Sequence, residues 1–252
     1  MTWKKWKAHF EANATRPLPE VTVEGLTPEQ HSALLHSLQI FQIGETGEGR
    51  VAHQIDKVTL PGIDADYRAA LKLFIKEEGR HAGILARAVL ALDGKLLTHA
   101  WVAKVFTHLR QWLGVRFKLL VLLVAEVIGI AFYGLISRAL PQGGLKAALA
   151  QLCDDEEQHL RFHCQFFAVQ SAKPLSHALL RLAWWPLAFA AGVAVLWDHR
   201  RALREFHIDT GTAARAMFAR VSESAVRMSK VGLSQRALGR RLRALRQNPP
   251  TA

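Results

Sequence analysis

The stretch DDEEQHLRFH, residues 154–163, decides the fold, because it gathers four acids and two histidines behind an apolar run. On a helix, Glu156 and His159 would share one face. The stretch KEEGRHAG, residues 76–83, repeats this spacing in Glu78 and His81. The two pairs alone do not define a site, because chance spacing produces such pairs in a chain this rich in Glu and His.

Other predicted helices contain acids that could add carboxylates to the two Glu-x-x-His pairs. The apolar run LLVLLVAEVIGIAFYGLI, residues 119–136, contains one charged residue, Glu126, near its middle. Burying a lone carboxylate there would cost on the order of several kcal/mol unless it is paired or bound to a metal ion. The stretch FQIGETGEGR, residues 41–50, adds Glu45 and Glu48.

The ligands of one hairpin should lie at one height along the helices, and this condition separates Glu45 from Glu48. The other acids lie at a similar number of residues from an end of their helix, and Glu45 matches this number better than Glu48 does. We therefore favour Glu45. Glu48 remains the alternative, because it is as far from Glu78 along the chain as the corresponding acids of the second hairpin are from each other.

Helical signals dominate the chain and strand signals are scarce. Thr27 and Pro28 mark a helix start, as N-cap and first helical residue, whereas Gly94 and Pro174 mark helix ends. The expected helices cover residues 28–56, 64–92, 98–114, 115–140, 145–172, 176–206 and 212–245.

This order of helices predicts an all-α fold, in which two helical hairpins, 28–92 and 115–172, form a four-helix bundle. The shorter helix 98–114 is long enough to serve as the one long crossover between the hairpins. We therefore expect an N-terminal segment 1–26, the bundle 27–173, and a C-terminal helical extension with a basic tail, 174–252.

Each hairpin offers one Glu in its first helix and a Glu-x-x-His pair in its second. Carboxylate oxygens with one imidazole per metal suit iron or manganese, and bridging carboxylates hold two such ions close together. The predicted metal ligands are Glu45, Glu78, His81, Glu126, Glu156 and His159. An ion-paired bundle core without metal is the competing interpretation.

Four further residues lie next to these ligands in the sequence. Asp155 could orient either histidine ligand by accepting a hydrogen bond from the ring nitrogen that does not face the metal. His163 is either a third nitrogen ligand or an outer or surface histidine. Glu77 and Glu157 are expected to be solvated or to lie outside the ligand set.

The ordered set Glu45, Glu78-x-x-His81, Glu126, Glu156-x-x-His159 resembles the ligand pattern of the ferritin-like di-iron carboxylate superfamily, over roughly residues 28–172. The segment GETGEGR, residues 44–50, is similar to the first-helix segment of rubrerythrins. The resemblance implies a ferritin-like four-helix bundle with extra C-terminal helices, and two iron ions, with manganese as the alternative metal.

The activity that this resemblance implies is that of a non-haem di-iron oxidoreductase. Such an enzyme activates O2 and hydroxylates, desaturates or N-oxygenates a small or apolar substrate, with electrons from a separate donor. One alternative is rubrerythrin- or ferritin-like peroxide reduction or iron oxidation, although the chain has no C-x-x-C pair for a rubredoxin module. The other is a non-enzymatic, basic-tailed helical bundle that binds membrane or nucleic acid.

The net charge of +12 is concentrated at the two ends of the chain. Residues 200–252 hold twelve Lys and Arg against three acids, and three lysines near the N-terminus account for the rest. Basic ends favour contact with anionic lipid, which the Trp-bearing segments 1–10 and 182–197 would strengthen by insertion. Nucleic acid is disfavoured, because the tail lacks interleaved aromatic residues for base stacking.

Each of these end signals also has a purely structural explanation. The tail could serve solubility alone, and both Trp-bearing segments could pack on the bundle. Asp198, His199 and Arg200 could form a functional cluster, but we favour a capping or salt-bridge role for them. Because the N-terminus lacks a signal-peptide core and the two Cys residues lie too far apart on one helix for a disulfide, we expect a cytoplasmic protein with peripheral attachment to a membrane.

Overall fold

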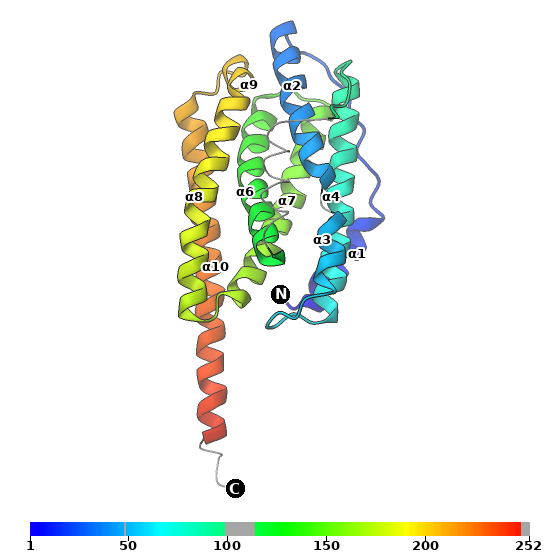
Figure 1. Cartoon of the computed structure of the whole chain (residues 1–252). Helices are drawn as coiled ribbons and strands as arrows, with labels where there is room; N and C mark the ends of the chain where they lie inside the picture. Colours follow the sequence, from blue (N-terminus) through cyan, green and yellow to red (C-terminus); the bar gives the residue numbers. More distant parts are fainter. Residues whose placement is uncertain (48, 99–113, 248–252) are drawn as a thin grey trace.

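The computed structural model describes residues 1–47, 49–98 and 114–247, and these residues form helices and loops without a strand (Figure 1). The predicted all-α fold is confirmed for this part of the chain. Glu48 lies outside the described residues, as does the predicted crossover helix 98–114 apart from its two end residues.

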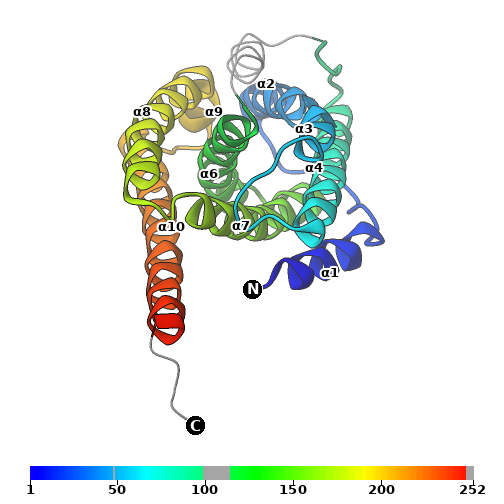
Figure 2. The same cartoon turned by 60° about the horizontal axis from the view of Figure 1, so that its bottom comes forward.

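Four long helices surround the interior of the bundle: α2 (Pro28–Gly44), α4 (Ala65–Ala91), α6 (Val115–Ala139) and α7 (Gly144–Gln170). α2 packs against α4, and α6 packs against α7, as the two predicted hairpins require. α4 and α7, which carry the two Glu-x-x-His pairs, also contact each other. Figure 2 shows the four helices arranged around a common interior.

The start of α2 is fixed by its N-cap. The Thr27 hydroxyl accepts a hydrogen bond from the Gln30 N–H at 3.2 Å, and the Gln30 side chain accepts one from the Thr27 N–H at 3.2 Å. Pro28, the first helical residue, has no N–H that would need a partner. The predicted start of this helix is therefore correct.

The first helix ends earlier than predicted. Instead of one helix over residues 28–56, α2 is followed by a 3-10 turn, η1 (Glu45–Gly47), and a short helix, α3 (Gly49–Ile55). Three glycines lower the helix propensity of residues 44–49, and a 3-10 turn within a helical stretch often marks a functional site. The turn η1 contacts α4, so Glu45 lies against the helix of the first Glu-x-x-His pair.

α6 is a buried core helix. By length and composition alone it could cross a membrane, but its most apolar part is largely buried inside the bundle. It packs against α7, α8 and α10. Glu126, near its middle, is 6% exposed, so the carboxylate within the apolar run is buried.

The N-terminal helix α1 (Trp3–Ala14) covers α4. Trp3, Trp6 and Phe10 are buried, and the rings of all three pack on the ring of Phe162. Of the two roles predicted for residues 1–10, packing on the bundle is the one found. These three aromatic side chains are therefore part of the core.

The C-terminal helices add a layer beside the bundle. α8 (Pro174–Asp198) lies along α6, and α10 (Thr210–Gln247) packs against α6, α7 and α8. Figure 1 shows α8 and α10 together on one flank, with the end of α10 running beyond the bundle. The predicted helix 176–206 is broken at His199, where the chain turns so that α9 (Arg200–Glu205) packs on α2.

Candidate metal centre

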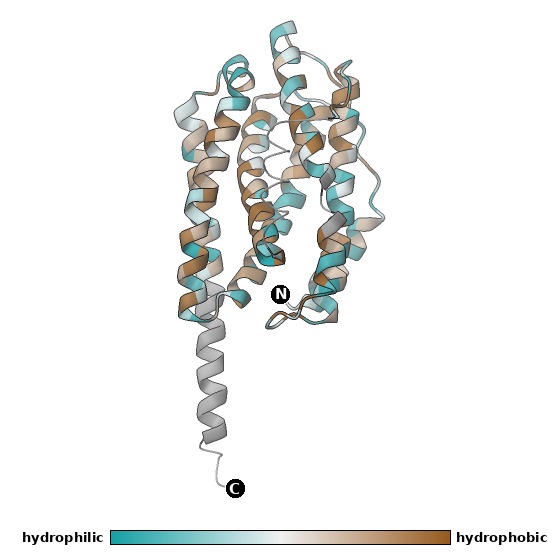
Figure 3. Cartoon of the chain, in the orientation of Figure 1, coloured by the Kyte–Doolittle hydropathy of each residue, from teal (hydrophilic) through white to brown (hydrophobic). Residues whose placement is uncertain are grey.

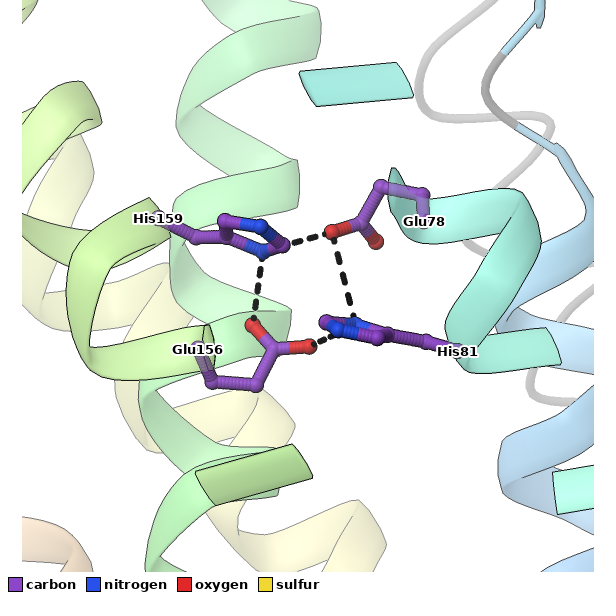
Figure 4. Close-up of side chains that lie close together, drawn as sticks. All are labelled: Glu78, His81, Glu156 and His159. Carbon is purple, nitrogen blue, oxygen red and sulfur yellow. Dashed lines mark hydrogen bonds and ion pairs between the residues drawn. The ribbon is translucent and has the colours of Figure 1, made fainter. Parts of the chain in front are cut away.

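The two Glu-x-x-His pairs meet in the interior of the bundle. Glu78 and His81 come from α4, Glu156 and His159 come from α7, and all four are at most 2% exposed. One ligand atom of each residue lies within 4.8 Å of those of the other three. In Figure 4 the dashed contacts join the four side chains into a closed ring.

The Nδ1 atom of each histidine faces both carboxylates. His159 Nδ1 lies 2.7 Å from Glu78 Oε1 and 3.3 Å from Glu156 Oε2. His81 Nδ1 lies 2.9 Å from Glu156 Oε1 and 3.9 Å from Glu78 Oε1. Within the described part of the chain, Glu78 Oε1, Glu156 Oε2 and His159 Nδ1 form no aligned hydrogen bond. His81 Nδ1 and Glu156 Oε1 are within hydrogen-bond distance of each other. The other converging atoms have no hydrogen-bond partner among the described residues, so their lone pairs are available to a cation.

The other ring nitrogen of each histidine faces an acid of the opposite hairpin. His81 Nε2 lies 3.5 Å from Asp155 Oδ2, and His159 Nε2 lies 3.4 Å from Glu77 Oε2. We call Glu77 and Asp155 the outer acids. Each outer acid precedes the Glu of its own helix, so the arrangement repeats across the two hairpins. An acid in this position can accept a hydrogen bond from the Nε2–H group, which would leave Nδ1 free to bind a metal ion.

Asp155 lies next to His81, a predicted ligand. Glu77 is buried, which excludes the solvated position and leaves the predicted position outside the ligand set. Arg16, which follows α1, pairs with Asp155 and lies 3.7 Å from Glu77. Asn13 donates a hydrogen bond to Glu77 Oε1 at 2.9 Å. Arg16 and Asn13 could not be assigned to the site from the sequence, because only the packing of α1 on α4 brings them to the outer acids.

Glu126 and Glu45 add two carboxylates from α6 and from the end of α2. Burial raises the pKa of Glu126 well above its ordinary value, and the charges of Glu156 and Glu78 raise it further. Burial, the same two charges and a hydrogen bond with Glu78 raise the pKa of Glu45 in the same way. The six predicted ligands therefore lie around one interior site, whereas Glu48 is outside the described residues.

His163 lies beside Glu126, with its Nε2 atom 3.3 Å from Glu126 Oε1. It is fully buried, so the prediction of a surface position is wrong. Burial and the nearby charge of His159 lower the pKa of His163 to about 3, which keeps its ring neutral. His163 therefore lies next to the predicted ligand Glu126 and outside the cluster of the two Glu-x-x-His pairs. Glu157 lies away from the cluster, in ion pairs with Arg220 and Arg227 of α10.

The electrostatic field of the cluster favours positive charge. Burial alone would lower the pKa of His81, but hydrogen bonds with Asp155 and Glu156 raise it to about 9. The pKa of His159 is also raised well above its ordinary value: burial opposes this, but the charges of Glu156 and Glu78 outweigh it. A site that stabilises cations on its own histidines is suited to a metal ion, and the Glu/His cluster can hold one.

An apolar cavity of about 110 Å³ adjoins the cluster. All four carboxylates contribute to its wall, and the rest comes mainly from apolar residues of α2, α6 and α8. Two further residues with polar side-chain groups line it, Tyr133 and His199. Both residues are buried, and neither Tyr133 Oη nor His199 Nδ1 has a hydrogen-bond partner among the described residues.

His199 is the C-cap of α8, the role that the sequence favours for it, and it also lines this cavity. Its ring stacks on Phe41 with the centroids 4.5 Å apart. Burial lowers the pKa of His199 to about 3, so the imidazole that faces the cavity is neutral. No local pattern could have placed it there, because the contact joins α2 to the end of α8.

Comparisons of the chain with protein-family models, with curated proteins and with solved structures found no match. The chemistry of the site is therefore inferred from its own side chains. They provide three buried carboxylates and the partly buried one of Glu45, two imidazoles that each face an outer acid, and an apolar cavity beside them.

Proposed function

We propose that the protein is a non-haem di-iron oxidoreductase with a ferritin-like bundle, which activates O2 and oxidises a small, apolar substrate. The observation that carries this proposal is the convergence of four carboxylates, three of them buried, and two buried histidines beside an apolar cavity. The donor set suits iron, with manganese as the alternative, because oxygen ligands with one imidazole per ion match the preferences of both metals.

In this proposal Glu78, Glu156, His81 and His159 form the centre of the site, and Glu45 and Glu126 complete it from the two partner helices. The outer acids keep the imidazole protons on Nε2 and fix the rings. Bound iron would supply the redox chemistry that protein side chains lack. Hydroxylation by O2 also needs two electrons and two protons from a donor, since one oxygen atom enters the substrate and the other leaves as water.

The cavity supports a small substrate with one polar group. Its volume of about 110 Å³ is of the same order as that of an engineered apolar cavity of about 150 Å³ that binds benzene. Tyr133 and the neutral His199 could each hydrogen-bond a hydroxyl, amine or carbonyl, while the surrounding side chains contact an apolar body. This lining favours oxidation of an organic molecule over rubrerythrin-like peroxide reduction or ferritin-like iron oxidation, which need no apolar cavity.

The test is metal content and iron turnover in the full-length protein. After iron-replete expression and aerobic purification we expect about two irons per chain and the optical absorption of an oxo-bridged pair. Reduced protein exposed to O2 should reoxidise these irons without accumulating a mineral core. Uptake of tens of irons per chain would instead support the iron-storage alternative. Metal at background level would overturn both interpretations and leave the ion-paired core.

A further inference from the structure

One face of α8 is apolar and exposed along the whole helix. The exposed apolar side chains recur every three to seven residues, which places them on one side of the helix, away from the bundle. Figure 3 shows hydrophobic segments alternating with more polar ones along α8. They are Leu175 (71% exposed), Leu179 (57%), Leu182 (72%), Phe189 (75%), Val193 (50%) and Trp197 (65%). We call these six residues the outer stripe.

The outer stripe is larger than the scattered apolar residues that protein surfaces normally carry. From Leu175 to Trp197 the helix rises by roughly 33 Å. Phe218 of α10, 65% exposed, extends the apolar surface, because its ring lies 6.0 Å from that of Trp185 and a groove of about 420 Å³ runs between the two helices. A contiguous exposed patch of this kind marks an interaction surface.

The charges around the outer stripe are basic. Arg181 is the one charged residue between Pro174 and Trp197, and it is exposed. Exposed Lys173 precedes the helix, and exposed Arg200 and Arg201 follow it. The acid of α8, Asp198, is only partly exposed. An occupant of this surface must therefore accept apolar side chains in its middle and cations at its edges.

We propose that the outer stripe docks onto an anionic lipid bilayer, with α8 lying in the plane of the interface. The apolar side chains would enter the acyl region, and the flanking basic residues would meet lipid phosphates. α8 would lie on the membrane and not cross it, because Trp184, Ala188 and Ala191 on its other face are buried against the bundle. This proposal does not depend on the metal centre.

A second copy of the chain is a poorer occupant. In a symmetric pair, whether the two α8 helices ran parallel or antiparallel, basic residues of one copy would meet basic residues of the other. No exposed acid of α8 would offset that repulsion. Residues 200–252 hold twelve Lys and Arg against three acids, so the adjoining chain adds to the preference for an anionic surface.

The test is sedimentation of the full chain with vesicles of phosphatidylcholine, with and without phosphatidylserine, at low and high salt. We expect binding to the anionic vesicles that weakens with salt but persists in part, because apolar insertion is not screened. The double variant Leu182→Gln, Phe189→Gln should weaken this binding at least tenfold, because two large apolar side chains no longer enter the bilayer. Arg181→Gln with Arg201→Gln should reduce binding at low salt only.

Leu90→Gln is the matched control, because Leu90 of α4 is 59% exposed and lies outside the outer stripe. It should bind vesicles as the unchanged protein does, and circular dichroism should show that all variants remain helical. Vesicle binding that the double variant leaves intact would overturn the proposal. So would a dimer in analytical ultracentrifugation that the double variant dissociates while vesicles go unbound, since that result assigns the stripe to a second copy.

Discussion

Glu126 is a buried carboxylate with neither oxygen hydrogen-bonded to a described residue. An unpaired carboxylate destabilises an apolar helix in the core, but it can bind a metal ion. We expect Glu126→Gln and Glu45→Gln each to lower iron content clearly below two per chain. Neither should lower the unfolding temperature in chelator, because a neutral amide of the same size costs less to bury than a carboxylate.

Metal analysis and thermal unfolding in chelator measure these two effects on the same samples. Glu157→Gln is the control, since Glu157 pairs with α10 and not with the cluster. Glu48→Gln resolves the choice that the sequence leaves open and should keep its iron. Full iron loading of the Glu126→Gln protein would show that α6 contributes no ligand.

His199 gives the fold a pH dependence of its own. Burial lowers its pKa to about 3 in the folded protein, whereas the unfolded chain takes up this proton near the ordinary pKa of about 6.5. Below that pH the unfolded state therefore binds more protons, and the free energy of unfolding falls as the pH decreases. Between pH 7.5 and 5 this residue should account for about 2 kcal/mol of lost stability.

Urea unfolding of His199→Gln at the two pH values measures this contribution. The variant should lose about 2 kcal/mol less than the unchanged protein over this range. His53→Gln is the control, because His53 is exposed on α3 and its replacement should leave the pH dependence unaltered. Parallel pH profiles for His199→Gln and the unchanged protein would contradict a buried, neutral imidazole.

Among the helices, α10 is held to the bundle by one acid and an apolar strip. Glu157 of α7 lies 2.8 Å from Arg227 Nη1 and 2.9 Å from Arg220 Nη1, and Met217 and Val221 are buried beside this pair. Glu157→Gln should lower the free energy of unfolding by about 1 kcal/mol, because these contacts are only partly exposed to solvent. Urea unfolding measures the change.

Glu24→Gln serves as the control for this element, because Glu24 is exposed in the loop before α2 and its replacement should change stability by less than about 0.5 kcal/mol. Iron content should be unchanged in both variants. A Glu157→Gln protein as stable as the unchanged one would mean that the apolar strip alone holds α10.

The helices were predictable wherever local chemistry marks their ends. Thr27 and Pro28 begin α2 as the capping pattern predicts. The break at η1 was not predicted. Three glycines in residues 44–49 lower the helix propensity there, but they do not by themselves show a 3-10 turn, and its contact with α4 arises only from tertiary packing. The sequence also could not show that α6 is buried and α8 largely exposed, since both helices are long and apolar. Only the packing of the helices distinguishes them.

For the whole molecule, the spacing of Glu and His within each helix predicted the residues at the centre of the site. It did not predict the residues around them. Glu78 with His81 and Glu156 with His159 can be paired from sequence, because each pair lies on one helical face. The contacts of Glu77, Arg16 and His199 join segments far apart in the chain, and no local pattern records them. Fold class and candidate ligands therefore follow from sequence, whereas the outer acids and the cavity require tertiary structure.

α8 has one more consequence if both proposals hold. Ala191 and Val195 line the cavity, while Phe189 and Val193 on the same two turns face outward, so a single helix about 10 Å across separates the lipid from the reaction chamber. The enzyme would then encounter its substrate at the concentration reached in the bilayer. Since each methylene favours the apolar phase by about 0.8 kcal/mol, roughly a fourfold enrichment, partitioning would sort candidate molecules by chain length before any of them touched the protein.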